Sequence, residues 1–317
     1  MNNCSIPGYD AMYYIMAQAS WEGVMNSIPF NSVIKIINQV AQSLFAKANL
    51  VKSGGCFLVD ESDIEQIADL YMEHRVKVPE GANFLKDRIR NRFLQDLNLS
   101  QQVIKELNEH YDTKVELCVC LKKGPKLGAV PFAVGGIGKE SIILYSPIRR
   151  IINEVPEAKD LQEVEKEDLQ FWNTITPRRR HVLAHEFSHI RHHDVLSKVV
   201  IRVVACVAAI VMWLPAVSLS YGLVPTLYLF AHSFVVQAGF SLLRIFWARA
   251  NEMRADKDAM NCLGSNEGAV SLLSILEKFE GTEKGVYHPS PSIRLEAAKN
   301  WKKDLSGAHF YNRLKQA

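Results

Sequence analysis

The stretch "RHVLAHEFSHIRHHD", Arg180 to Asp194, carries the strongest signal in this sequence. Within it, His185, Glu186 and His189 form the pattern H-E-F-S-H. Histidines four residues apart lie on one face of a helix, so two imidazoles can bind one Zn²⁺ while the glutamate between them reaches the open side of the metal. We therefore predict a helix that carries a zinc site. A polar helix that is merely rich in histidine is the alternative.

The chemistry of such a site follows from the glutamate. Zinc lowers the pKa of a bound water towards neutrality, and a carboxylate beside that water can take its proton and deliver it to a leaving amine. Glu186 is the candidate for this general base, and the reaction would be peptide hydrolysis. The pattern H-E-x-x-H also occurs by chance, so the rest of the chain has to supply a third ligand.

A candidate third ligand lies in "ARANEMRADKDAM", residues 248–260. Glu252 can complete a set of two histidines and one glutamate, which would leave the fourth zinc position open. Asp256, one helical turn further, can accept a hydrogen bond from the far ring nitrogen of a zinc-bound histidine. Ordinary surface pairs with Arg254 or Lys257 are the alternative for these two acids.

Four elements follow one another along the chain: "PFAVG" at 131–135, "VLAHEFSH" at 182–189, "EMRAD" at 252–256 and "HPSPSIR" at 288–294. In this order they resemble the integral-membrane zinc metallopeptidases of the HtpX and CAAX-prenyl-protease types, which are gluzincins. The resemblance covers roughly residues 110 to 300.

The resemblance implies a metal centre with one Zn²⁺ per chain. Its ligands would be His185, His189 and Glu252, with Glu186 as the general base. Asp256 would stand behind the ligands and orient one of the histidines.

The resemblance also implies residues around the substrate. His288 and Arg294 match catalytic positions near the metal that help to hold the oxyanion or the ligand glutamate. The strand with Phe132, Ala133 and Val134 would be the edge along which an extended substrate pairs by backbone hydrogen bonds. Because such pairing recognises the main chain rather than the side chains of the substrate, it favours broad specificity.

Two apolar runs, residues 199–219 and 223–243, lie between the second histidine and Glu252. A helix of about 20 apolar residues crosses a hydrocarbon core of about 30 Å. The turn 220–222 is uncharged, whereas basic residues flank the outer ends of the runs: Arg191, Lys198, Arg202, Arg244 and Arg249. The positive-inside rule places these ends in the cytoplasm. We expect two membrane-spanning helices; a hydrophobic helical hairpin, 199–243, buried in protein is the alternative.

Composition limits the remaining choices. The 317 residues, 48% of them hydrophobic, suffice for a sizeable core. Because 37 basic residues nearly balance 34 acidic ones, we expect no nucleic-acid partner. The six cysteines form no C-x-x-C pair and the N-terminus lacks a secretory pattern, so we expect reduced thiols in a cytosol-facing protein.

The predicted fold class is α+β and mostly α. It combines a gluzincin metallopeptidase core, a small antiparallel sheet and the hydrophobic helical hairpin. Alternating residues predict strands at 114–121, 129–136 and 140–147, and Thr176-Pro177 predicts the start of the H-E-x-x-H helix. Residues 11–110 show mostly helical spacing.

Two regions are predicted. Residues 1–110 form a helical N-terminal region of unknown role, outside the resemblance. Residues 111–317 form the zinc metallopeptidase domain, interrupted by the hairpin. His181, one turn before His185, could extend the metal-binding face, although the three ligands are complete without it.

The predicted function is that of a membrane-associated zinc endopeptidase. Its partners would be polypeptide substrates, misfolded membrane proteins among them, and the lipid bilayer, with the catalytic domain facing the cytoplasm in a multi-pass arrangement. Membrane protein quality control is the expected setting. The competing hypothesis is a catalytically idle, zinc-stabilised scaffold or chaperone, in which Glu186 would be dispensable.

Overall fold

The computed structural model describes residues 56–59, 62–75, 83–120, 132–134, 141–145, 161–218, 223–280 and 287–302. Helices dominate this part of the chain, as expected: α3 (Ile64–Arg75), α4 (Asn83–Tyr111), α6 (Leu161–Arg191), α7 (Asp194–Ser218), α8 (Leu223–Leu263), α9 (Glu267–Glu280) and α10 (Pro291–Lys299). The helical segments expected before residue 56 and the turn 220–222 lie outside the described residues.

A small sheet lies beside the helices. It consists of β1 (Cys56–Leu58), β2 (Glu116–Cys120), β3 (Phe132–Val134) and β4 (Ser141–Tyr145) in the order β1-β2-β4-β3. The outer pairs are antiparallel, but β2 and β4 are parallel. The expectation of an antiparallel sheet is therefore wrong for the central pair, because the chain passes from β2 to the far edge and returns through β4 beside β2.

One hydrophobic core joins α3, α4, β2 and α6 to the end of α8. Tyr71 stacks on Phe93 with 4.3 Å between ring centroids, and Tyr111 lies 5.6 Å from Phe187 on α6. Cys262 at the end of α8 closes the same cluster. The described part of the region before residue 110 thus shares its core with α6 and α8, while the predicted division at this residue stays a prediction.

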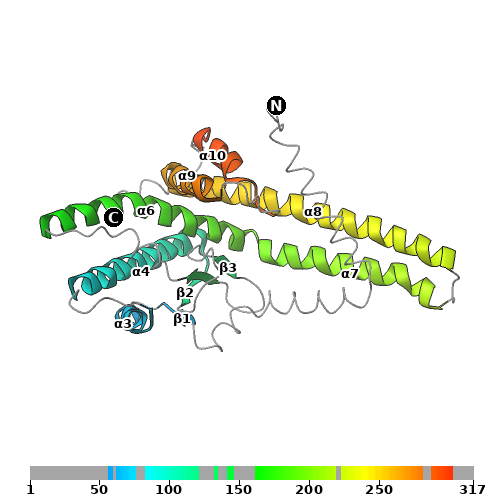
Figure 1. Cartoon of the computed structure of the whole chain (residues 1–317), viewed down its shortest axis with the longest axis horizontal. Coiled ribbons are helices and arrows are strands. Elements are labelled where there is room, and N and C mark those ends of the chain that lie inside the picture. The colour runs from blue at the N-terminus through cyan, green and yellow to red at the C-terminus, as the bar shows by residue number, and fades with distance from the viewer. Residues whose placement is uncertain are drawn as a thin grey trace, which may run out of the picture.

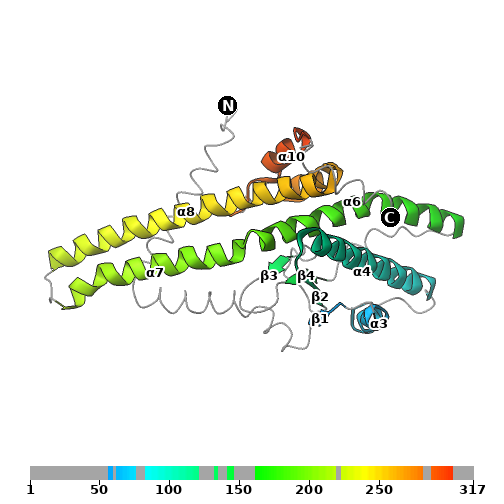
Figure 2. The same cartoon turned by 180° about the vertical axis from the view of Figure 1, so that it is seen from behind.

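Helices α4 and α6 lie alongside each other (Figures 1 and 2). A buried ion pair connects them, in which Arg179 Nε and Nη2 donate to Asp96 Oδ1 and Oδ2 at 2.7 and 2.5 Å. Because both groups are withdrawn from water, this bidentate pair fixes how the two helices are aligned.

Helix α6 begins at Leu161, so the expectation that it starts at Pro177 is wrong. Pro177 lies inside the helix, where it lacks the N–H that would bond to the carbonyl four residues earlier. Gly268 of α9 packs directly on this turn: a Cβ there would lie 2.2 Å from the Pro177 carbonyl oxygen and 2.8 Å from His181 Cβ. Only glycine permits this approach of α9 to α6.

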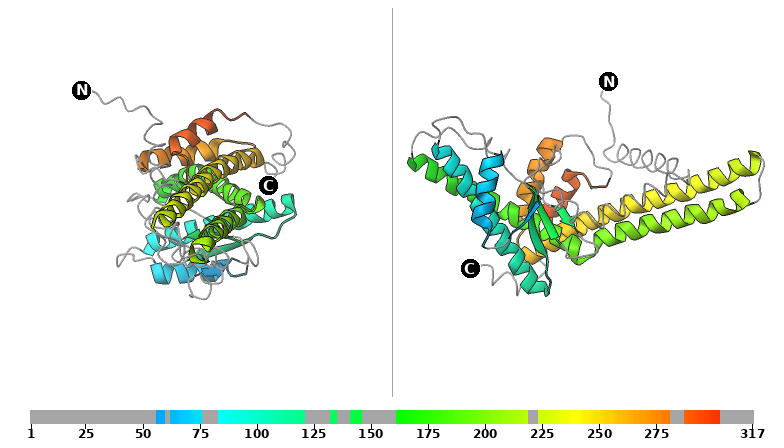
Figure 3. Two further views of the ribbon diagram at one scale, coloured as in Figure 1. Left: turned by 90° about the vertical axis from the view of Figure 1, so that its right-hand side faces the viewer. Right: turned by 90° about the horizontal axis from the view of Figure 1, so that it is seen from below.

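Helices α7 and α8 lie side by side and extend beyond the other described elements (Figure 3). Their buried sides mix polar and small residues with the apolar Val199 and Ile245; Gln237 Nε2, for example, donates to the Ala205 carbonyl oxygen at 2.8 Å. Their exposed sides carry many apolar residues: Leu196, Val200, Val203, Val204, Val207, Ile210, Val211, Val235, Leu243, Phe246 and Trp247. In a water-soluble helix pair, the exposed side is usually polar.

Among the helices that the structure describes, none combines the length and the apolar character that crossing a membrane requires. The prediction of two spanning helices is thus not supported. Buried polar side chains, Ser233, Gln237 and Ser241, interrupt the second apolar run.

Candidate metal centre

Helices α6 and α8 pack along each other and bring three buried side chains together. Helix α6 supplies His185 and His189, and α8 supplies Glu252. The two Nε2 atoms are 3.1 Å apart, and the Glu252 oxygens Oε2 and Oε1 lie 3.4 Å from His185 Nε2 and His189 Nε2, respectively. The two nitrogens and the carboxylate, which meets each nitrogen with a different oxygen, thus form a triangle of candidate ligands, the ligand triangle.

The size of this triangle suits zinc. Tetrahedral Zn²⁺ with bonds of about 2.0–2.1 Å holds its ligand atoms about 3.3 Å apart. The three residues could hold a metal ion, and a set of two histidines and one glutamate leaves one position for water or substrate. The donor set and its dimensions thus fit a catalytic zinc ion.

The far side of each histidine contacts an aspartate. His185 Nδ1 lies 2.9 Å from Asp256 Oδ1, and His189 Nδ1 lies 2.7 Å from Asp194 Oδ2. A neutral imidazole that donates from Nδ1 keeps the lone pair of Nε2 for a metal. Both rings are therefore oriented for binding through Nε2.

Asp194 was not predicted from the sequence. It is the first residue of α7, and His193 before it has a positive φ of 52°, which breaks the helix between α6 and α7. This break returns Asp194 to the ring of His189. The signal in the sequence was an acid placed five residues after the second histidine.

An arginine binds each of these two aspartates. Arg254 Nη2 donates to both oxygens of Asp194 at 2.6 Å. Arg294 of α10 donates from Nε and Nη2 to Asp256 Oδ2 and Oδ1 at 2.7 and 2.8 Å, and its Nη1 lies 3.4 Å from the ligand Glu252. The arginines neutralise the buried acids and fix their direction.

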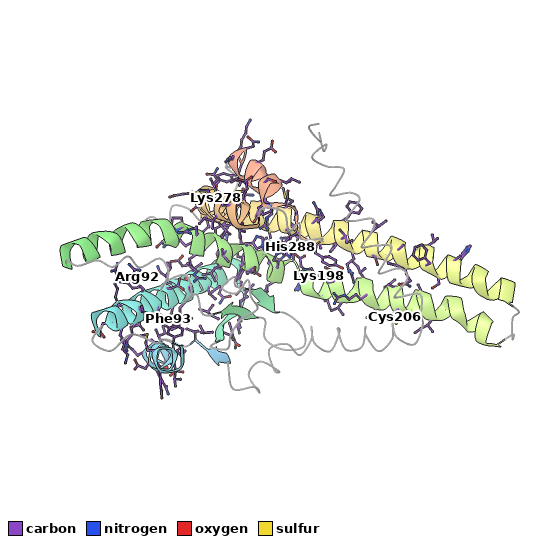
Figure 4. All side chains as sticks on the ribbon, viewed as in Figure 1. Arg92, Phe93, Lys198, Cys206, Lys278 and His288 are labelled. Carbon is purple, nitrogen blue, oxygen red and sulfur yellow. The ribbon has the colours of Figure 1, made fainter. Side chains whose placement is uncertain are left out.

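His288 lies on the open side of the cluster. Its Nδ1 is 3.2 Å from Glu252 Oε2, yet its side chain is 61% exposed. Figure 4 labels this residue next to α8, where that helix passes α6. Arg249 Nη1 donates to the His288 carbonyl oxygen at 3.4 Å, which helps to place the ring. His288 is thus accessible to a ligand while in contact with the Glu252 carboxylate.

Electrostatics hold the cluster in an ionised form. Burial would raise the pKa of Glu252, but hydrogen bonds with His185 and His189 hold it far below its ordinary value. Burial would lower the pKa of His185, but hydrogen bonds with Asp256 and Glu252 raise it to about 10. Without metal, protons therefore take the place of the cation, and binding a metal must release them.

Glu186 is also buried on α6, beside the first histidine. Burial lowers the pKa of His189, whereas hydrogen bonds with Asp194 and Glu252 and the charge of Glu186 raise it. The carboxylate thus acts electrostatically on the cluster without belonging to the ligand triangle, and its role as a general base stays a prediction.

His181 lies one turn before His185 and is 1% exposed. With His185 and Asp256 it forms a second set that could hold a metal. A cation there would face the Arg294 guanidinium, which already binds both oxygens of Asp256. We therefore assign the metal to the set that contains Glu252.

Among the described strands, β3 (Phe132–Val134) lies at one edge of the sheet, next to α6. Its use as a substrate-binding edge stays a prediction. The side chains of Phe132, Ala133 and Val134, and the glycine turn that follows them, lie outside the described residues.

A family model described as peptidase family M48 matches residues 101–302. This range contains the ligand triangle, both aspartates and the segment of His288. No curated protein and no solved structure matches the chain.

Proposed function

The chain belongs to peptidase family M48 and is thus a metallopeptidase, and we propose that it is a zinc endopeptidase that cleaves polypeptides with one Zn²⁺ per chain. The observation that carries this proposal is the triangle of His185 Nε2, His189 Nε2 and the Glu252 carboxylate, with sides of 3.1–3.4 Å. These dimensions suit tetrahedral zinc.

When bound, zinc supplies the Lewis acidity that activates water and polarises the scissile carbonyl. Glu186 accepts the proton of the attacking water and transfers it to the leaving nitrogen. Asp194 and Asp256 hold the histidine rings through Nδ1, so the ligand triangle is formed before substrate arrives.

His288 and Arg294 divide the remaining tasks. Arg294 donates to Asp256 and contacts Glu252, so it holds the ligand carboxylate in place. His288 is largely exposed and contacts Glu252 through Nδ1, so its ring can donate to the oxyanion of the substrate.

The substrate is an extended polypeptide. It adds to the sheet at the edge strand β3 through backbone hydrogen bonds, which place little demand on the side chains of the substrate. Unfolded segments of many proteins would therefore be cleaved.

We place the apolar outer sides of α7 and α8 against lipid. Their exposed valines and aromatic residues, together with basic residues at the ends of the two runs, support contact with an anionic membrane surface. Misfolded membrane proteins would then be the accessible substrates. The cytoplasmic position of the catalytic domain stays a prediction.

Flotation with lipid vesicles tests this contact. Val207→Asp combined with Val211→Asp should release the purified chain from vesicles, because both side chains are exposed on α7. Ile293→Asp on α10, also at an exposed apolar residue, is the matched control and should leave flotation unchanged. Equal release by both variants would contradict a specific lipid-binding surface.

Cleavage of peptides with both ends blocked tests the endopeptidase activity. The zinc-loaded protein should cut these peptides internally, a chelator should stop the reaction, and added zinc should restore it. A requirement for a free terminus would contradict the proposal.

A further inference from the structure

His181 is a buried imidazole that the ligand triangle does not use. Its ring lies one turn before His185 on the same face of α6, with 6.3 Å between the ring centroids. Among the described residues, neither ring nitrogen has a hydrogen-bond partner within normal limits. A polar ring withdrawn from water without a partner is costly, so its presence calls for a role.

The ring is directed at Asp256. His181 Nε2 lies 3.5 Å from Asp256 Oδ1, the oxygen that also faces His185 Nδ1 at 2.9 Å. A neutral imidazole has one N–H, which in the Nε2–H form lies beside this oxygen, at a separation longer than that of a normal hydrogen bond. The geometry thus gives a chain of contacts from His181 through Asp256 to His185, whose Nε2 belongs to the triangle.

Packing holds the ring in this place. Gly268 of α9 lies so close that an added Cβ would be 2.8 Å from His181 Cβ. Arg294 reaches the same carboxylate from α10. Asp256 is therefore held between α6 and α10, and His181 and His185 both contact it from the α6 side.

We propose that His181 is a positioning residue, which steadies Asp256 and through it the orientation of the zinc ligand His185. This inference rests on the proposed zinc centre. It predicts that removal of the Nε2–H of His181 weakens zinc binding, although His181 never touches the metal.

The test compares two variants of the full chain. His181→Met removes the N–H at similar volume, whereas the amide of His181→Gln can place an N–H where Nε2 stood. Zinc affinity, measured by competition with a chelator, should fall about tenfold in His181→Met and stay within about twofold in His181→Gln, because the loss of outer hydrogen-bond partners typically weakens metal binding about 10–100-fold. The absorption spectrum of the Co²⁺-substituted protein should shift in His181→Met alone.

A purely structural role would change the unfolding temperature of the metal-free protein without changing these two properties. If His181→Met does not fold, His181→Asn replaces it, because its amide stands at the Nδ1 position and cannot reach Asp256. The proposal is overturned if His181→Met or His181→Asn keeps the zinc affinity and the Co²⁺ spectrum of the wild type. It is also overturned if His181→Gln loses as much zinc affinity as these variants.

Metal stoichiometry separates the remaining outcomes. A second zinc equivalent that disappears with His181 would show a ligand rather than a positioning residue. Wild-type protein that binds no zinc would overturn the proposed function as well. If the wild-type protein binds zinc and cleaves polypeptides, and both His181 variants bind zinc as tightly as the wild type, this inference alone is overturned.

Discussion

Asp194 Oδ2 lies 2.7 Å from His189 Nδ1, so the acid that begins α7 fixes the ring of the second histidine of α6. Asp256 does the same for His185 from α8. The two aspartates lie on different helices, and each is bound by its own arginine. The metal centre thus depends on four side chains beyond its three ligands.

Asp194→Asn should weaken zinc binding by about 10–100-fold, because loss of an acceptor behind a metal-binding histidine typically has this effect. Competition with a chelator measures the change. Asp258→Asn is the matched control, since Asp258 contacts His192 and Ser188 outside the ligand triangle. Equal losses in the two variants would show that Asp194 has no special part in the site.

Zinc affinity should rise with pH. His185 has a pKa raised from 6.5 to about 10, so below that pH zinc must displace its proton. One displaced proton changes the apparent affinity by about tenfold per pH unit. Zinc titrations at about pH 6 and about pH 8 compare the apparent affinities, and the control His192→Asn should show the same change of affinity with pH. An affinity independent of pH would contradict the described protonation.

The same raised pKa predicts the stability of the metal-free protein. The folded state binds the His185 proton more tightly than the unfolded state, so this contribution is fully present below pH 6.5 and is lost as pH rises towards 10. Urea unfolding of the metal-free protein between about pH 6.5 and about pH 10 measures this contribution to the free energy of unfolding. A contribution that grows with pH would contradict the prediction. Zinc should oppose the trend, because it replaces the proton.

Gly268→Ala should destabilise the fold by about 1–3 kcal/mol, the usual cost of overpacking a close contact. The new Cβ would meet the Pro177 carbonyl oxygen at 2.2 Å and push α9 away from α6. Gly239→Ala on α8 is the control, since nothing lies within 4 Å of that Cβ. Urea unfolding compares them; an unchanged free energy of unfolding in Gly268→Ala would refute the tight packing.

Local helical spacing made the two candidate histidine ligands predictable, because His185 and His189 are four residues apart and share a face. Glu252 and Asp256 have the same spacing, but the resemblance to the zinc metallopeptidases was needed to select them. Residues four apart lie on the same face of any helix, so such spacing can be read from the sequence without knowledge of the tertiary structure.

The features that were missed depend on tertiary structure. Asp194 reaches the site only because His193 adopts a left-handed conformation. Arg254 donates to Asn251 on its own helix, but its ion pair is with Asp194 of α7. Pro177 lies inside a helix that α9 supports from outside. The parallel pairing of β2 with β4 follows from a crossover that alternation of side chains does not encode.

Glu186→Gln tests the central claim most directly. Glutamine keeps the size of the side chain and leaves the ligand triangle intact, but it cannot accept a proton from water. The variant should therefore bind one zinc per chain with wild-type affinity and cleave unfolded casein at least about 10²–10⁴-fold more slowly, the usual loss when a positioned general base is removed. A zinc-loaded variant that cleaves casein as fast as wild type would contradict the proposed mechanism, and a wild-type protein that binds zinc but cleaves no polypeptide would favour the idle scaffold.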